Sequence, residues 1–75
     1  MAPNSSPATL TRMIIELILS KRIVHYQDIM EYTGTSRKTI AKYLNEVEKV
    51  VNQQGVHLVR KRGQGIRFSG NTKGL

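Results

Sequence analysis

Gly34-Thr35-Ser36-Arg37-Lys38-Thr39-Ile40 places a glycine, a serine and two adjacent cations within one short stretch of the chain. Glycine adopts positive φ angles at low cost and can end a helix, whereas serine is a preferred N-cap and can begin the next one. The apolar residues that follow recur at the spacing of one buried helix face: Ile40, Leu44, Val47 and Val51. The stretch therefore predicts a turn that leads into a basic amphipathic helix over residues 36–52, which Gly55 terminates.

A first helix is predicted near the start of the chain. Its apolar residues recur three and four positions apart, namely Leu10, Met13, Ile14, Leu17 and Ile18. We expect Thr9 or Thr11 to cap this helix. Lys21-Arg22 is expected to close it, because positive charge suits the carboxyl end of the helix dipole.

A second helix is predicted between the first helix and the turn. The β-branched pair Ile23-Val24 predicts a very short strand before it. The helix itself is expected to begin at His25 or Tyr26 and to end at Thr33-Gly34, with Ile29 and Met30 buried. Among the tyrosines, Tyr32 is expected to cover the core between the first two helices.

Beyond Gly55 the apolar period changes to two, which is typical of strands. Val56 and Leu58 alternate with His57, and the stretch Arg62-Gly63-Gln64-Gly65-Ile66-Arg67-Phe68 follows. Its two glycines supply the dihedral angles of a tight loop, which indicates an antiparallel β-hairpin. The whole pattern predicts an α+β fold with three helices and a small antiparallel hairpin. The second and third helices form a helix-turn-helix pattern, to which the hairpin adds a wing.

The chain has 75 residues, enough for one small domain. We expect a flexible leader at residues 1–8, a winged helix-turn-helix domain at residues 9–69 and a linker or frayed end at residues 70–75, cut from a longer protein. The absence of cysteine excludes disulfides and thiolate metal sites. No apolar run reaches the roughly 18 residues of a membrane span, and no secretory signal pattern is present. We therefore expect a cytoplasmic protein that does not associate with membranes.

Charge is distributed very unevenly along the chain. The formal net charge is +7, and residues 1–35 sum to zero. Residues 36–75 hold nine basic side chains against Glu46 and Glu48, so the whole excess lies in the half that contains the third helix and the hairpin. A polyanionic partner explains this asymmetry better than solubility does.

Donor side chains lie on the third helix away from its apolar face. The candidate DNA-binding residues of this helix are Ser36, Arg37, Lys38, Thr39, Lys42 and Asn45. Lysine and arginine can contact phosphates or guanine acceptors, asparagine can pair with adenine, and threonine can contact a phosphate or a thymine methyl group. Ser36 caps the helix while neighbouring amides meet a phosphate. The alternative is an ordinary solvated helix face, since most exposed helix faces are charged.

The predicted hairpin adds Arg60, Lys61, Arg62 and Arg67, with no acidic residue among them. We assign Lys61, Arg62 and Arg67 to DNA binding, because a basic hairpin can follow the backbone and place an arginine in a narrow minor groove. The alternative is that these cations only protect an edge strand from aggregation.

Other kinds of site find little support in the sequence. His25 and His57 are isolated, so neither belongs to a metal site. No cofactor motif, acid–base pair or nucleophile–base set is visible, so we expect no cofactor and no enzymatic activity. Tyr26 fits either a phosphate contact through its hydroxyl or a packing role.

Residues 10–69 resemble the N-terminal winged helix-turn-helix domain of bacterial sugar-operon regulators, such as the mannitol and lichenan operon activators. The DNA-binding domain of the biotin repressor is similar. The resemblance rests on Thr35-Ser36-Arg37-Lys38-Thr39-Ile40 with Lys42 and Leu44, on Gly55-Val56-His57-Leu58, and on the stretch from Arg62 to Phe68. His25 departs from the pattern, because a serine or threonine cap is common there.

The resemblance implies sequence-specific binding to double-stranded DNA, with the helix at residues 36–52 in the major groove and the wing at residues 60–67 on the flanking backbone or minor groove. Such regulators are controlled by the phosphotransferase system and commonly act as homodimers through other domains, so we expect the isolated domain to be a monomer. The rival hypothesis is a winged helix that binds an acidic protein partner. RNA binding is less favoured, since single-strand readers use stacking aromatic pairs.

Overall fold

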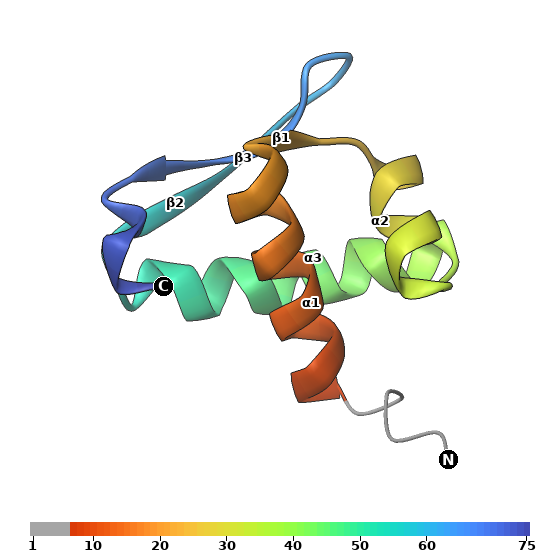
Figure 1. Ribbon diagram of the computed structural model, residues 1–75, viewed down its shortest axis with the longest axis horizontal. Coiled ribbons are helices and arrows are strands. Elements are labelled where there is room, and N and C mark those ends of the chain that lie inside the picture. The colour runs from red at the N-terminus through yellow and green to blue at the C-terminus, as the bar shows by residue number, and fades with distance from the viewer. Residues whose placement is uncertain (1–6) are drawn as a thin grey trace.

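The computed structural model describes the backbone of residues 7–75 and the side chains of residues 9–75. Three helices and a three-stranded antiparallel sheet make an α+β fold, as expected (Figure 1). The elements in chain order are α1 (Pro7–Lys21), β1 (Ile23–Val24), α2 (Tyr26–Thr33), α3 (Arg37–Asn52), β2 (Val56–Lys61), β3 (Gly65–Gly70) and the short 3-10 helix η2 (Thr72–Gly74).

Helix α1 begins earlier than the sequence analysis predicted. Its first residue is Pro7, so Thr9 and Thr11 lie inside the helix and neither caps it. Proline is favoured in the first turn, where its missing N–H has no helical partner to lose. Residues 7 and 8 of the expected leader are therefore helical, and residues 1–6 lie outside the described part. The helix ends at Lys21, as expected, and Arg22 follows with a φ of 72°.

The turn between α2 and α3 has the predicted chemistry. Helix α2 ends at Thr33, and Gly34 adopts a φ of 69°, with its amide donating to the Met30 carbonyl. Ser36 then caps α3, its hydroxyl oxygen accepting from the Thr39 amide at 3.4 Å. The start of α2 is capped from within, because Asp28 accepts the His25 amide proton at 2.8 Å. The two helices are thus joined by a short connection in which Gly34 and Ser36 make the hydrogen bonds that end α2 and begin α3.

The sheet has the order β1-β3-β2, with all neighbours antiparallel. The two-residue strand β1 is real, and it pairs with the β3 residues Ile66 and Arg67. Strands β2 and β3 form the expected hairpin, with Lys61 opposite Gly65 at the last pair before the tip. Because β3 is central, β1 pairs with the hairpin at the end next to its tip, and the tip projects beyond β1 (Figure 1).

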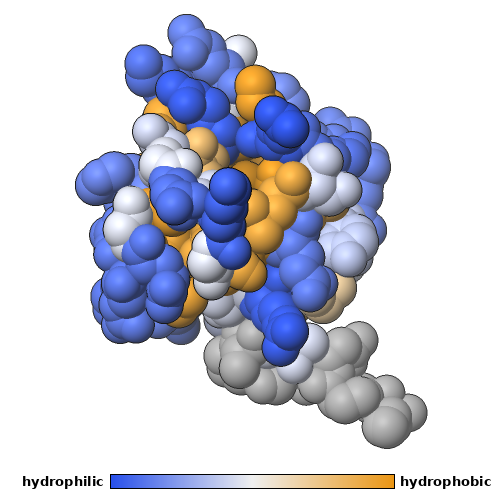
Figure 2. Space-filling view, turned by 60° about the vertical axis from the view of Figure 1, so that its left-hand side comes forward, coloured by the Kyte–Doolittle hydropathy of each residue, from blue (hydrophilic) through white to orange (hydrophobic). Residues whose placement is uncertain are grey.

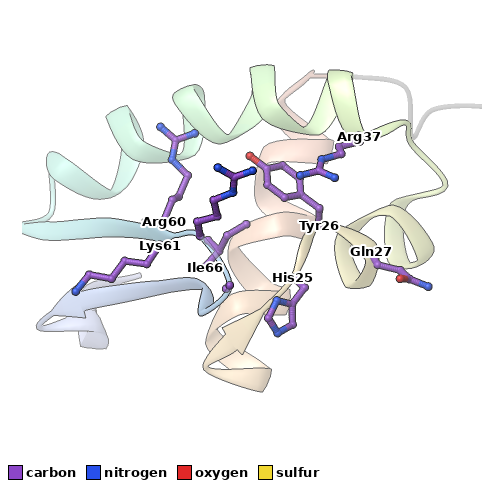
Figure 3. A pocket seen from close by; sticks show the side chains of 10 residues that line it. His25, Tyr26, Gln27, Arg37, Arg60, Lys61 and Ile66 are labelled. Carbon is purple, nitrogen blue, oxygen red and sulfur yellow. The ribbon is translucent and has the colours of Figure 1, made fainter.

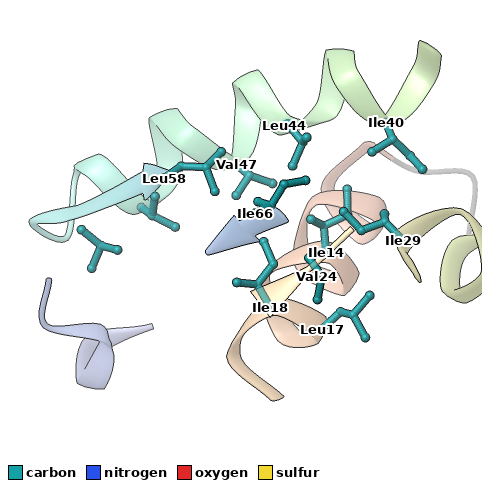
Figure 4. Close-up of a cluster of buried hydrophobic side chains, with 12 residues drawn as sticks. Ile14, Leu17, Ile18, Val24, Ile29, Ile40, Leu44, Val47, Leu58 and Ile66 are labelled. Atoms are coloured by element: carbon teal, nitrogen blue, oxygen red, sulfur yellow. The ribbon is translucent and has the colours of Figure 1, made fainter. Parts of the chain in front are cut away.

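The core lies between the three helices and one face of the sheet (Figure 4). The helical stripes predicted from the sequence supply much of it, and the fully or nearly buried residues are Ile14, Leu17, Ile18, Val24, Ile29, Ile40, Leu44, Val47, Val51, Val56, Leu58 and Ile66. Tyr26 and Tyr43 pack against this cluster. Tyr32 was wrongly placed over the core, because its side chain is 49% exposed at the end of α2.

The chain continues in contact with the domain after β3. Helix η2 spans Thr72–Gly74, and Leu75 packs against the core although residues 70–75 were expected to be a linker or frayed end. Leu75 also lines a shallow groove with Ile15 and Leu19 of α1 and Val50 of α3. This groove is on the side that bears the C-terminus, where Figure 2 shows hydrophobic side chains ringed by hydrophilic ones.

Within residues 7–75, no helix is both long and apolar enough to cross a lipid bilayer.

Candidate nucleic-acid interface

Helix α3 carries a second stripe that mirrors its buried one. The buried stripe consists of Ile40, Leu44, Val47 and Val51, and the same spacing two residues earlier gives Lys38, Lys42, Asn45 and Lys49. A shift of two residues rotates the position by about 200° around a helix of 3.6 residues per turn. All four residues of this second set are exposed. We call them the polar stripe, and they form a ridge of donors that faces directly away from the core.

The start of α3 holds two further sequence candidates, Ser36 and Thr39. Besides accepting the Thr39 amide, the Ser36 hydroxyl donates to the Thr39 hydroxyl at 3.0 Å. These bonds fix the first turn of the helix, whose remaining free amides point outward and favour an anion. Both residues therefore act on the geometry of the helix start, and Thr39 lies beside the polar stripe without belonging to it.

A cleft separates the starts of α2 and α3 from the tip of the β2–β3 hairpin (Figure 3). We call it the hairpin cleft, and its volume is about 590 Å³. Its lining residues are His25, Tyr26, Gln27, Arg37, Arg60, Lys61, Arg62, Gly63, Gly65 and Ile66. Four of these side chains are cations and none is an acid. The cleft is open to solvent, so it suits an extended anionic chain better than a small enclosed ligand.

Tyr26 and Arg37 interact across the turn between the two helices. The Arg37 guanidinium carbon lies 4.7 Å from the centroid of the Tyr26 ring, which is cation–π geometry. Tyr26 is itself partly buried against the core. The aromatic ring therefore acts as a fixed platform that directs the Arg37 side chain along the wall of the hairpin cleft (Figure 3).

Arg60 connects the hairpin to α3. Its Nη2 atom lies 3.4 Å from Asn45 Oδ1 and 3.7 Å from Glu48 Oε1. The four hairpin cations were expected to have no counter-charge, and this was wrong for Arg60, because Glu48 of α3 provides one. The pair is half-exposed, with side chains 35% and 40% accessible, so its contribution to stability is below about 1 kcal/mol. Its effect is chiefly to orient Asn45.

The other hairpin candidates do not lie together. Lys61 and Arg62 line the hairpin cleft near the tip, although Lys61 extends away from Tyr26 and Arg37 (Figure 3). Arg67 is in the middle of β3, between Ile66 and Phe68, which both pack toward the core. Strand alternation places Arg67 on the outer face of the sheet, beside Ile23 and Val59. The structure therefore does not bring Arg67 to the hairpin cleft.

Eight cations have no ion pair among the described residues, and five of them lie on two adjoining surfaces, whereas Arg22, Arg67 and Lys73 lie elsewhere. Among the described residues, the ion pairs of Arg12, Lys21, Lys49 and Arg60 satisfy those four cations. No such pair involves the five basic residues of the polar stripe's first half and the hairpin cleft, which are Arg37, Lys38, Lys42, Lys61 and Arg62. A set of uncompensated charges on adjoining surfaces produces a local positive potential that attracts polyanions.

The described part of the chain shows no candidate metal site. Residues 7–75 contain no group of three or more histidine, cysteine, aspartate or glutamate side chains placed to hold a metal ion. His25 borders the hairpin cleft, whereas His57 lies on the outer face of β2 and is exposed. The two histidines therefore lie apart.

Three features of the site were not predicted from the sequence. Lys49 continues the polar stripe, and the shared spacing of 38, 42, 45 and 49 was available as a signal. The Tyr26 contact with Arg37 had no such signal, because it depends on the angle between α2 and α3. The bridge from Arg60 to Asn45 and Glu48 likewise depends on how the hairpin packs against α3.

Comparison with protein-family models, with curated proteins and with solved structures gave no match.

Proposed function

We propose that the chain is a winged helix-turn-helix domain that binds double-stranded DNA in a sequence-specific manner. In this assignment α2, the Gly34 turn and α3 are the helix-turn-helix, and the β2–β3 hairpin is the wing. The observation that carries the proposal is the polar stripe of α3, which faces away from the core and adjoins a cleft lined by four cations and no acid. If the polar stripe were only an ordinary solvated helix face, there would be no reason for a second basic surface, the hairpin cleft, to adjoin it.

Helix α3 fits the role of the element in the major groove. Its 16 residues correspond to about 24 Å at 1.5 Å per residue, which is more than enough to cross a groove about 12 Å wide. Ala41 is half-buried at the edge of this face, next to Lys42, and adds little bulk, so the backbone can approach the bases closely. Lys38, Lys42 and Asn45 then face the base edges or the phosphates that border them.

The hairpin cleft fits the role of a phosphate-binding surface. Arg37 is held on the Tyr26 ring at one wall, and Arg62 lies at the hairpin tip on the other. A DNA strand that leaves the major groove beside the start of α3 would pass between these walls. Its phosphates would meet guanidinium groups, which donate paired hydrogen bonds to phosphate oxygens.

The resemblance to bacterial sugar-operon regulators supports a role in transcriptional regulation of sugar uptake or metabolism in the cytoplasm. In such proteins other domains provide phosphotransferase-dependent control and most of the dimer contacts. We therefore propose that a full-length parent binds paired half-sites as a homodimer and that residues 7–75 alone bind one half-site as a monomer.

A binding assay with three labelled probes tests this function. The probes are a mixed-sequence DNA duplex, a single-stranded RNA of equal length and an acidic peptide, followed by fluorescence anisotropy at two salt concentrations. The proposal expects tightest binding to the duplex, with affinity falling steeply as salt rises because counterions are released from DNA. Binding to the acidic peptide without binding to the duplex at low salt would favour the rival protein-interaction role.

A further inference from the structure

Arg60 is placed to control what Asn45 can recognise. It follows Leu58 by two positions on β2, so its side chain leaves the same face of the sheet and extends toward α3 (Figure 3). There the guanidinium group lies between Asn45 and Glu48, which are three residues apart on the helix. Arginine has several donors in a fixed planar fork, so one side chain can satisfy both partners together.

The contact determines which atom of the Asn45 amide faces the hairpin. Arginine carries only donors, so the atom that it meets must be the acceptor Oδ1. The Nδ2 group, with its two donors, is the other branch of the amide, and it is accessible to a ligand because Asn45 is exposed. Glu48 restrains the guanidinium group from its other side, at 3.7 Å, and this keeps the bridge in place.

We propose that Arg60 biases Asn45 toward donating hydrogen bonds to DNA bases and so sets the base that this position prefers. The inference rests on the proposed DNA-binding function. Asparagine recognises adenine by accepting from N6 and donating to N7 at the same time, which needs both amide atoms. Arg60 occupies one lone pair of Oδ1, and its positive charge beside the second one disfavours the approach of the N6 donor of adenine. The N–H groups of Asn45 are then favoured, and these suit the two acceptors of guanine or the O4 acceptor of thymine. Under this proposal adenine is the disfavoured base at the Asn45 position, in contrast to the pairing expected from the sequence.

The test compares base preferences by selection from a randomised duplex library. Asn45→Ala first identifies the base position that depends on Asn45. At that position the parent is expected to favour guanine or thymine over adenine by about tenfold, a typical discrimination for one good side-chain contact. Arg60→Met keeps the aliphatic stem but removes the bridge, and it should reduce this preference below about threefold or shift it toward adenine.

Lys61→Met is the matched control. It removes one positive charge from the neighbouring position, but Lys61 extends away from Tyr26 and Arg37, and the hydrogen bond to Asn45 Oδ1 comes from Arg60. Both variants should lose affinity and salt dependence, and only Arg60→Met should change the preferred base. If Arg60 contributes charge alone, the two variants will select the same sequences as the parent, and the inference is overturned.

The outcomes separate this inference from the function on which it rests. A parent that fails to bind any duplex at low salt contradicts the proposed function itself. A parent that selects a defined sequence in which the Asn45-dependent position favours adenine, or is unchanged by Arg60→Met, contradicts only the role of Arg60. The bridge has a separate readout without DNA, because the side-chain amide resonances of Asn45 should shift in Arg60→Met and stay in place in Lys61→Met.

Discussion

The guanidinium carbon of Arg37 lies 4.7 Å from the centre of the Tyr26 ring, so the first residue of α3 rests on the first residue of α2. Such a contact contributes about 0.5–1 kcal/mol at an exposed site, which is a small part of the stability of a domain. Its larger consequence is that it fixes the direction of the Arg37 side chain. A long, flexible cation is held along one wall of the hairpin cleft before any ligand arrives, which reduces the ordering cost of binding.

Replacement of Tyr26 by leucine should therefore weaken DNA binding through Arg37. We expect a loss of about two- to fivefold in affinity, corresponding to a cation–π contact of 0.5–1 kcal/mol. Tyr26→Phe is the control, because it keeps the ring and removes only the hydroxyl. If Tyr26→Phe loses as much affinity as Tyr26→Leu, the hydroxyl contacts the ligand directly and the platform account of Tyr26 is wrong.

Lys42 lies at the centre of the polar stripe, and Lys42→Ala should reduce operator affinity by about fivefold or more, since a base or phosphate contact is lost. The fold should survive, because Lys42 is exposed and the buried stripe is untouched. Lys73→Ala is the control, because it removes the same charge from η2, which does not line the hairpin cleft. Anisotropy titrations that give equal affinities for Lys42→Ala and the parent would remove Lys42 from the interface.

Arg62 at the hairpin tip should contribute affinity without sequence preference. Arg62→Ala is expected to weaken binding to operator and random duplexes by the same factor, because a phosphate contact carries no base information. The slope of log affinity against log salt should become less steep by about 0.9 if one phosphate contact is lost. A loss confined to the operator duplex would instead mean that Arg62 reads bases in the minor groove.

The two glycines of the hairpin tip should differ in their tolerance of a side chain. Both have positive φ, 79° at Gly63 and 87° at Gly65, so alanine costs about 1–2 kcal/mol at either position. At Gly65 an added Cβ would also lie 2.9 Å from Ile23 Cγ2 and from the Val24 carbonyl oxygen, whereas at Gly63 it would meet nothing within 4 Å.

Gly65→Ala should therefore be the more destabilising change, by a further 1–3 kcal/mol or so for overpacking against β1. Each kcal/mol corresponds to about 4–8 °C in a domain of this size, so thermal denaturation followed by circular dichroism resolves the two variants. Equal melting temperatures would show that β1 moves aside at little cost and does not anchor the hairpin.

The sequence predicted those parts of the fold that depend on local periodicity and local chemistry. The stripe from Ile40 to Val51, the Gly34 turn and the Ser36 cap are each encoded within a few residues, and all three are confirmed. The predicted start of α1 was wrong, because Thr9 and Thr11 were expected to be caps and Pro7 was not considered, although proline also favours a first helical turn. The prediction that Tyr32 covers the core was wrong, because aromatic character alone does not determine which side of α2 faces the core.

The candidate site was less predictable, because its contacts join segments far apart in the sequence. Arg60 pairs with Asn45 across 15 positions, and no pattern in the chain specifies that distance. Arg67 was grouped with Arg62 because both are basic and close in sequence. Strand alternation nevertheless places Arg67 on the outer face of a central strand, and only the sheet order reveals that β3 is central.

The most direct test of DNA binding is an NMR titration of the chain with a mixed-sequence duplex at low and at moderate salt. The account predicts amide shifts in two regions together, the Ser36–Asn45 segment of α3 and the hairpin tip from Lys61 to Gly65. Both sets of shifts should weaken steeply as salt rises. An unchanged spectrum at low salt, or shifts confined to the groove lined by Leu19 and Val50, would contradict the proposal that this basic surface binds DNA.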